Sequence, residues 1–212
     1  MEHPILMPDE GVRAILDGRK TQTRRVVQAD RYSPWIPHME DARADPGLGD
    51  GGYLHVPYTT DGDRVTRRVR CRYAIGDRLW VRETWCQQAC MVHGDLLPGK
   101  AHYRADGYEV RHVDGPGKSP WRPSIHMPRW ASRITLEVTA VRVERLQDIT
   151  EEDARAEGVE PTVMVAAGVP EREVLVPAVG VYRNLWDRIN GKRHPWASNP
   201  WVWVVSFRRA VA

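Results

Sequence analysis

The chain has 212 residues, with 31 lysines and arginines against 28 aspartates and glutamates and a formal net charge of +3. This length suits one domain with a sizeable core, so we expect a single domain over residues 1–212. The slight basic excess permits nucleic-acid binding without requiring it. No apolar run approaches the ~20 residues that span a bilayer, so we expect no membrane partner.

Cysteine usage indicates the compartment and bears on metal binding. Cys71, Cys86 and Cys90 have no paired spacing and follow no secretory signal, so we expect free thiols in a cytoplasmic protein. Cys86, Cys90 and His93 lie close in the sequence but lack a fourth ligand at a customary spacing. We therefore expect neither a metal nor another cofactor.

The first predicted elements are a strand over 4–7 and a short helix. Val12, Ile15 and Leu16 have helical spacing, and Gly18 stands where a left-handed helix cap is common. Beyond the glycine, a polar run with almost no apolar residue extends to Arg25. Residues 28–68 are rich in Pro, Gly and Asp, which predicts an inserted loop or small hairpin.

The middle of the chain carries two strand signals separated by a second insertion. Leu79 and Val81 alternate with polar or aromatic neighbours and predict a strand after the turn at Gly76. Residues 91–129 are punctuated by prolines and are interpreted as a lid or rim. The alternation over 134–146 is the longest strand signal in the chain.

Two helices and a strand complete the pattern. Thr150 is a good N-cap for a helix that ends at Gly158, and a third irregular insertion follows over 161–180. Residues 181–190 predict a helix with Val181, Leu185 and Ile189 facing inward. Residues 201–207 are apolar on both faces, as in a strand of a small barrel. These elements predict an α+β fold around a small curved sheet or barrel.

Lys20 and Thr23, in the polar run after the first helix, are the first candidate reacting groups. A lysine partly desolvated beside Arg24 or Arg25 has a lowered pKa, and it can take a proton from a threonine hydroxyl to make a nucleophile. An ideal strand would put Lys20 and Thr23 on opposite faces, so the pairing requires a bent backbone. The alternative is a solvated basic loop.

Glu157 is the third candidate because of its place on a helix. It stands at the negative end of the helix, just before Gly158, where a carboxylate is disfavoured electrostatically. A cationic partner such as Lys20, or a role in acid–base chemistry, would explain it. An exposed glutamate at a helix end is the alternative.

Arginines and tryptophans near the second strand form a candidate substrate surface. Arg82 and Glu83 follow Trp80, and Arg129 precedes Trp130 in the proline-rich segment. Alternating arginine and tryptophan suits a nucleotide, since aromatic rings stack on bases. An outward-facing strand with ion pairs and a pinned loop are the alternatives for these residues.

Several segments together carry a family resemblance. The segments ILDGRKTQTRRV, GDRLWVRETW, VTAVRVERLQDITEEDARAEGV and NPWVWVVSF resemble the ASCH-domain family, whose fold is PUA-like. The segment PSIHMPRWASRITLEV is similar to one shared by its larger, phage- or prophage-encoded members. The resemblance implies a small β-barrel with flanking short helices and a cleft for nucleotides or RNA.

The resemblance also implies an activity. Small N4-acetylcytidine amidohydrolases of this superfamily carry a similar GRKTxT segment, and their catalytic residues fall on Lys20, Thr23 and Glu157. The implied reaction is metal-independent attack of Thr23 on the acetyl amide, releasing acetate and cytidine. From the residue pattern, we expect the nucleoside or RNA substrate to be bound by Arg24, Trp80, Arg82, Glu83, Arg129 and Trp130. Other relatives are ribonucleases or RNA-binding modules, so an RNA-binding or nucleolytic function is the alternative.

Overall fold

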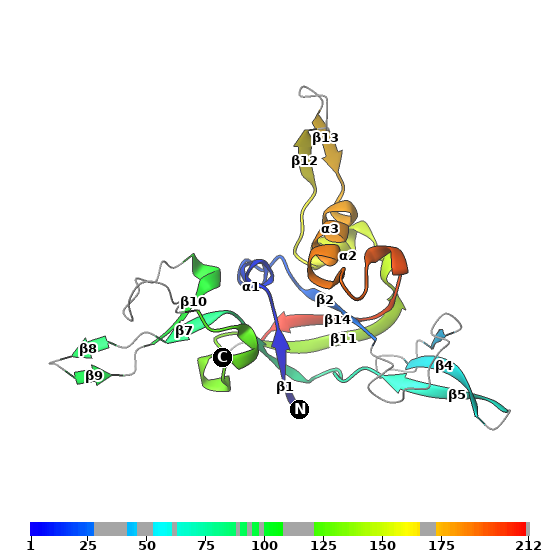
Figure 1. Cartoon of the computed structure of the whole chain (residues 1–212), viewed down its shortest axis with the longest axis horizontal. Helices are drawn as coiled ribbons and strands as arrows, with labels where there is room; N and C mark the ends of the chain where they lie inside the picture. The colour runs from blue at the N-terminus through cyan, green and yellow to red at the C-terminus, as the bar shows by residue number, and fades with distance from the viewer. Residues whose placement is uncertain are drawn as a thin grey trace.

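The computed structural model describes residues 1–27, 42–45, 53–60, 63–87, 90–92, 95–97, 100–107, 121–165 and 173–210. In these residues the fold is α+β, as predicted, with many strands and a few short helices. Figure 1 shows a sheet at the centre, helices above it, and hairpins that project away from it.

A five-stranded sheet forms the centre of the fold. Its strands, in spatial order, are β1 (Glu2–Leu6), β6 (Arg78–Arg82), β11 (Thr135–Arg145), β14 (Trp201–Arg209) and β2 (Gln22–Val26). β1 and β6 are parallel, and the other pairs are antiparallel. The sheet is open, with β1 and β2 at its edges, and no closed barrel is found in the described residues.

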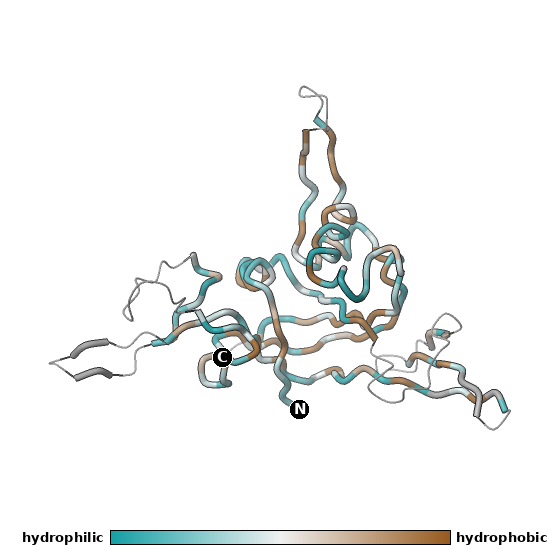
Figure 2. The backbone as a smooth tube through the Cα atoms, in the orientation of Figure 1, coloured by the Kyte–Doolittle hydropathy of each residue, from teal (hydrophilic) through white to brown (hydrophobic). Residues whose placement is uncertain are grey.

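The terminal strand β14 is buried on both faces, which explains its apolar sequence. Val202 and Val204 pack in a cluster with residues of the helices α2 (Glu151–Ala156) and α3 (Ala178–Asn190). Trp203, Val205 and Phe207 belong to the main core on the other face. The continuous apolar run therefore reflects a strand between two apolar layers, and Figure 2 shows this part of the sheet as largely hydrophobic.

The predicted helix signals are confirmed. Helix α1 (Asp9–Leu16) is followed by Gly18 at φ +75°, and the Thr150 hydroxyl accepts a hydrogen bond from the Asp153 amide at 3.1 Å. Gly158 follows α2 at φ +89°, and a Cβ there would lie 2.7 Å from the Cβ of Ala14. Glycine is therefore required where α2 crosses α1.

The predicted inward face of α3 is wrong for two of its three residues, because Leu185 packs against a core cluster but Val181 and Ile189 are not part of one. The buried residues of α3 are Ala178, Tyr182 and Trp186, whereas Ile189 is 53% exposed. Two apolar stripes run along this helix, one position apart, and the aromatic stripe packs on the core because it provides the larger apolar surface.

The three insertions contain strands in their described parts. The first carries β3 (Arg43–Asp45), β4 (Tyr53–Thr60) and β5 (Asp63–Arg70), in line with the predicted hairpin. The second carries β8 (Cys90–Val92), β9 (Asp95–Leu97) and β10 (Ala101–Tyr103), which pairs with β7 (Trp85–Gln87). The third, expected to be irregular, contains the hairpin of β12 (Thr162–Val165) and β13 (Glu173–Val176).

The hairpin of β12 and β13 projects from the helical layer, and its described side chains are largely exposed although many are apolar (Figures 1 and 2). The second insertion also has short 3-10 turns at Ser124–His126 and Arg129–Ala131.

No helix in the described part of the chain is long and apolar enough to cross a membrane.

Candidate functional site

The polar run after α1 is held between the ends of two helices. The Lys20 amide donates to the carbonyl of Ala14 at 2.9 Å, and the Thr21 amide donates to that of Ala156 at 2.8 Å. The chain then enters edge strand β2. Lys20, Thr23 and Arg24 are each no more than 7% exposed, so the solvated-loop alternative is wrong for this run.

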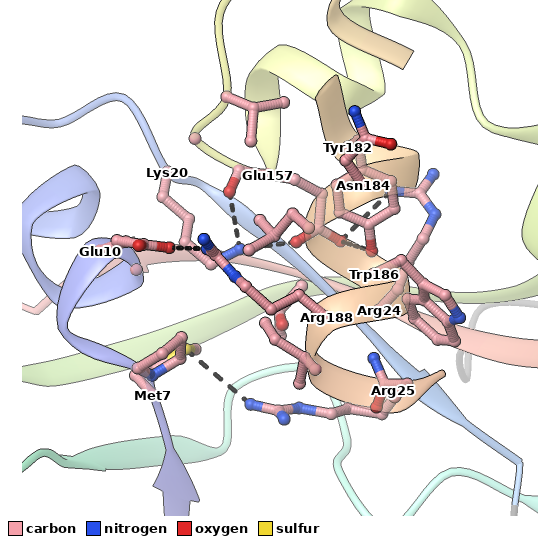
Figure 3. Close-up of a pocket in the computed structure, with 18 of the residues that line it drawn as sticks. Met7, Glu10, Lys20, Arg24, Arg25, Glu157, Tyr182, Asn184, Trp186 and Arg188 are labelled. Carbon is pink, nitrogen blue, oxygen red and sulfur yellow. Dashed lines mark hydrogen bonds and ion pairs between the residues drawn. The ribbon is translucent and has the colours of Figure 1, made fainter. Parts of the chain in front are cut away.

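A cavity of about 880 Å³ lies where β2 meets the first part of α1, the end of α2 and the length of α3 (Figure 3). Lys20, Thr23, Arg24 and Glu157 all line it. The structure therefore brings together the three residues predicted to be catalytic, although they come from two segments more than 130 residues apart in the sequence.

Lys20 and Glu157 form a buried ion pair on the wall of this cavity. The Nζ of Lys20 donates to Oε2 of Glu157 at 2.6 Å and to the Glu157 carbonyl at 2.9 Å. Burial lowers the pKa of Lys20, and this effect exceeds the opposing attraction of the Glu157 carboxylate. Glu157, predicted to need a cationic partner at its helix end, has one in Lys20.

Arg24 connects the pair to a larger carboxylate network. Its Nη2 donates to Glu144 at 2.6 Å and to Asp153 at 3.0 Å, and its Nη1 donates to Oε1 of Glu157 at 3.3 Å. Burial alone would lower the pKa of Arg24, but the charges of Glu157 and Glu144 outweigh it and raise the pKa. Arg24 therefore stays charged, fixing Glu157 in place.

Tyr182, on α3, is a site residue that the sequence analysis missed. Its hydroxyl donates to Oε1 of Glu157 at 3.4 Å, and the Arg24 guanidinium lies 5.9 Å from its ring centre. Burial and the charge of Glu157 raise the pKa of Tyr182 well above its ordinary value. The sequence did contain a signal for it: Tyr182 and Trp186 are four residues apart, so both rings lie on the same face of α3.

Thr23 lies on β2 opposite Val205 and is 5% exposed. No hydrogen bond of its hydroxyl is found within the described parts of the chain. Thr23 is therefore a cavity-lining residue whose hydroxyl proton is not held by an acceptor in the described parts of the chain.

Most of the predicted substrate-binding residues lie away from this cavity. The lining residues of the cavity do not include Trp80, Arg82, Glu83, Arg129 or Trp130. The guanidinium carbons of Arg82 and Arg129 lie 5.3 and 5.8 Å from the Trp80 ring centre, and Arg129 also pairs with Glu2 at 2.8 Å. The side chains of Trp80, Arg82 and Arg129 therefore form a separate cation–aromatic cluster near β6. They do not share the cavity with the predicted catalytic residues.

Glu83 and Trp130 have opposite exposures in that region. Glu83 is fully buried, and Arg133 donates to its two carboxylate oxygens at 3.0 Å each. This arrangement leaves the Glu83 carboxylate no surface for a substrate. Trp130 is 62% exposed and packs edge-on against Trp85 at 5.6 Å between ring centres.

No group of three or more His, Cys, Asp or Glu side chains in the described residues is placed to hold a metal ion. His93 and the side chain of Cys90, from the set considered above, lie outside the described residues. Comparisons with models of protein families, with curated proteins and with solved structures gave no match. The functional assignment therefore depends on the geometry of the site.

Proposed function

We propose that this protein is an amidohydrolase that removes the acyl group from an N4-acylated cytosine nucleoside or nucleotide. One observation carries the proposal: Lys20, buried and 2.6 Å from Glu157, lies on the wall of a cavity that Thr23 also lines. A desolvated lysine next to a proton acceptor and a hydroxyl is a suitable arrangement for nucleophilic catalysis.

In the proposed first step, one Nζ proton of Lys20 passes to Oε2 of Glu157, leaving a neutral amine. This amine takes the Thr23 hydroxyl proton while Thr23 Oγ1 attacks the acyl carbon. The bond from the acyl carbon to N4 then breaks, and Lys20 returns the proton to N4, so the free cytosine amine leaves and the acyl group stays on Thr23.

In the second step, water attacks the acyl-threonine ester. Lys20 takes a proton from the water and returns it to Thr23 Oγ1, so that a carboxylic acid leaves. The proton held on Oε2 of Glu157 then returns to Lys20, which regenerates the starting ion pair. Arg24 and Tyr182 both donate to Oε1 of Glu157, the oxygen that does not bind Lys20. Their role is to hold the carboxylate with Oε2 turned toward Lys20.

The finer fold assignment is part of the same proposal. We interpret the open sheet and its helices as the ASCH type of PUA-like fold, with β1 and β2 as the strands that would meet if the sheet closed. The GRKTQT segment between α1 and β2 supports this interpretation, because its Lys20 and Thr23 line the cavity.

A chromatographic assay of acetate release from N4-acetylcytidine and N4-acetylcytidine 5′-monophosphate tests the proposal. Thr23→Val removes only the hydroxyl and should abolish turnover, whereas Thr23→Ser should retain it. Lys20→Met and Glu157→Gln should lower kcat by about 10²- to 10⁴-fold. If folded wild-type protein releases product from neither of the two substrates, the hydrolase proposal is rejected.

A module that binds RNA or nucleotides is the second candidate, because six cationic side chains line the cavity against two carboxylates. Such a module should bind single-stranded RNA with an affinity that falls steeply as salt rises. A ribonuclease would also cleave that RNA. RNA binding that does not depend on salt, without cleavage of the RNA, would reject both the binding module and the ribonuclease.

A further inference from the structure

The cationic side chains of the cavity fall into two groups. Lys20 and Arg24 are compensated by Glu157 and by the other carboxylates of their network, and Arg188 pairs with Glu10 across the cavity. The remaining three, which form no ion pair with any described residue, are Arg25, Lys192 and Arg193. The positive charge is therefore balanced by carboxylates for one group of cavity-lining side chains and not for the other.

Arg25 is half-buried and fixed without being neutralised. Its Nη2 donates to the backbone carbonyl of Leu6 at 2.6 Å and contacts Sδ of Met7 at 3.8 Å. A carbonyl orients the guanidinium but leaves its full positive charge. Figure 3 shows this side chain reaching toward Met7, on the opposite side of the view from the pair of Lys20 and Glu157. Its Nε and Nη1 retain donors for a ligand.

Lys192 and Arg193 follow the C-terminal end of α3 and are exposed. Cations at this position are favoured by the helix dipole alone. The dipole, however, does not explain why Arg25, from a different element, lines the same cavity. Three cations from two elements around one hollow are typical of a site for a phosphate group.

An apolar wall connects the two groups. Val181, Leu185 and Ile189, the stripe predicted to face the core, line the cavity along α3. Val181 and Ile189 are eight residues apart, which corresponds to roughly 12 Å along a helix. This wall provides an apolar surface for the flat base between the acyl-transfer residues and the exposed cations at the end of α3.

We infer that the substrate carries a phosphate, and that Arg25, with Lys192 and Arg193, binds it while the acylated base lies along α3 with its amide at Thr23. This inference rests on the proposed hydrolase and selects, from the two substrate classes proposed above, the nucleotide over the nucleoside. The phosphate belongs either to a free nucleotide or to an RNA strand, and the two sources are distinguishable by experiment.

The test compares kcat/KM for N4-acetylcytidine, its 5′-monophosphate, and a short oligoribonucleotide with one internal N4-acetylcytidine. We expect the monophosphate to exceed the nucleoside by about tenfold or more, since charge-assisted hydrogen bonds are the strong ones. Arg25→Gln should remove most of this preference, measured as the ratio of kcat/KM for the monophosphate to kcat/KM for the nucleoside in the same variant. Preference for the oligonucleotide over the monophosphate would assign the phosphate to RNA.

Arg208→Gln is the matched control, because Arg208 is 68% exposed, pairs with Glu137 and does not line the cavity. Equal kcat/KM for nucleoside and monophosphate would overturn the phosphate site and leave the hydrolase intact. If no substrate is turned over, the proposed hydrolase activity is rejected. Calorimetry with cytidine and cytidine 5′-monophosphate then tests the phosphate site. Tighter binding of the monophosphate that Arg25→Gln abolishes supports it, and equal binding overturns it.

Discussion

Two clusters of arginine and aromatic side chains in this protein have similar compositions and opposite environments. In the first, Arg24 lies against Tyr182 with a side chain that is 0% exposed; in the second, Arg129 lies near Trp80 with a side chain that is 45% exposed. The first lines a cavity and the second does not. Residue type alone therefore does not indicate which cluster forms a site.

The difference comes from the number of carboxylates that reach each arginine. Arg24 reaches Glu144 on β11 and both Asp153 and Glu157 around α2, whereas the ion pair of Arg129 is with Glu2. Burying a guanidinium is costly unless several acceptors surround it. The folded chain provides three such acceptors for Arg24 where β2, β11 and α2 meet, so this charged cluster can be buried on the wall of a cavity.

Replacing the central arginine of each cluster should give the largest contrast. Arg24→Gln leaves three carboxylates without their shared cation, and we expect it to lower the free energy of unfolding by about 3–5 kcal/mol. Arg129→Gln removes an exposed pair and should cost less than about 1 kcal/mol. Urea denaturation monitored by tryptophan fluorescence measures both changes. Equal losses for the two variants would show that the clusters do not differ energetically.

Two glycines with similar backbone angles test how closely the site is packed. Gly158 has φ +89° and Gly76 has φ +85°, so alanine at either position suffers left-handed strain of about 1–2 kcal/mol. At Gly158 the new methyl would also lie 2.7 Å from Ala14 Cβ and 3.0 Å from Lys20 Cβ, whereas nothing lies within 4 Å at Gly76. Gly158→Ala should therefore cost about 1–3 kcal/mol more than Gly76→Ala.

The overlap at Gly158→Ala should also displace Lys20, so this variant is expected to lose catalytic activity while Gly76→Ala retains it. Thermal or urea unfolding and the acetate assay together give the result. Equal destabilisation by the two alanines would mean that α1 and α2 are less closely packed than the structure shows.

Local sequence signals were sufficient for much of the fold but not for the site. The alternation around Leu79, the N-cap at Thr150 and the glycine stops each depend on neighbouring residues, and the structure confirms them. The bridge between Lys20 and Glu157 joins residues 137 positions apart. Its prediction came from the electrostatic misfit of Glu157 and from the family resemblance.

Other features of the site required the tertiary structure. Nothing near Arg24 in the sequence indicates that Glu144 and Asp153 would surround it. The two apolar stripes of α3 differ by one position, so Val181 was assigned to the core and the buried Tyr182 was overlooked. Glu83 follows an alternating strand, yet its burial depends on Arg133, 50 residues away. Such pairings are set by chain topology, which periodicity does not contain.

The stability of the two clusters should also respond differently to pH. Burial lowers the pKa of Lys20 below its ordinary value of 10.5, so between the two values the unfolded chain binds a proton that the folded chain lacks. The unfolding free energy should therefore rise with pH in this window. Relative to Lys20→Met, the wild type should gain stability as the pH approaches about 10.

The matched control is Arg129→Gln, whose difference from the wild type should stay constant over the same range because an arginine does not titrate there. The series stops near pH 10 because Tyr182, with its raised pKa, acts with the opposite sign above that value. A wild-type advantage over Lys20→Met that falls as the pH rises would contradict the direction given for Lys20.

The smallest effect is expected for the ion pair of Glu10 and Arg188, which connects α1 to α3 across the cavity. Both side chains are more than half exposed, so Glu10→Gln should change the unfolding free energy by less than about 1 kcal/mol, as should Glu2→Gln at the pair with Arg129. The two variants should differ in function, because only Glu10→Gln removes a negative charge from the cavity. KM for N4-acetylcytidine 5′-monophosphate at low salt should fall for Glu10→Gln and stay unchanged for Glu2→Gln. A KM that is equal in both variants would show that the field inside the cavity does not act on the substrate.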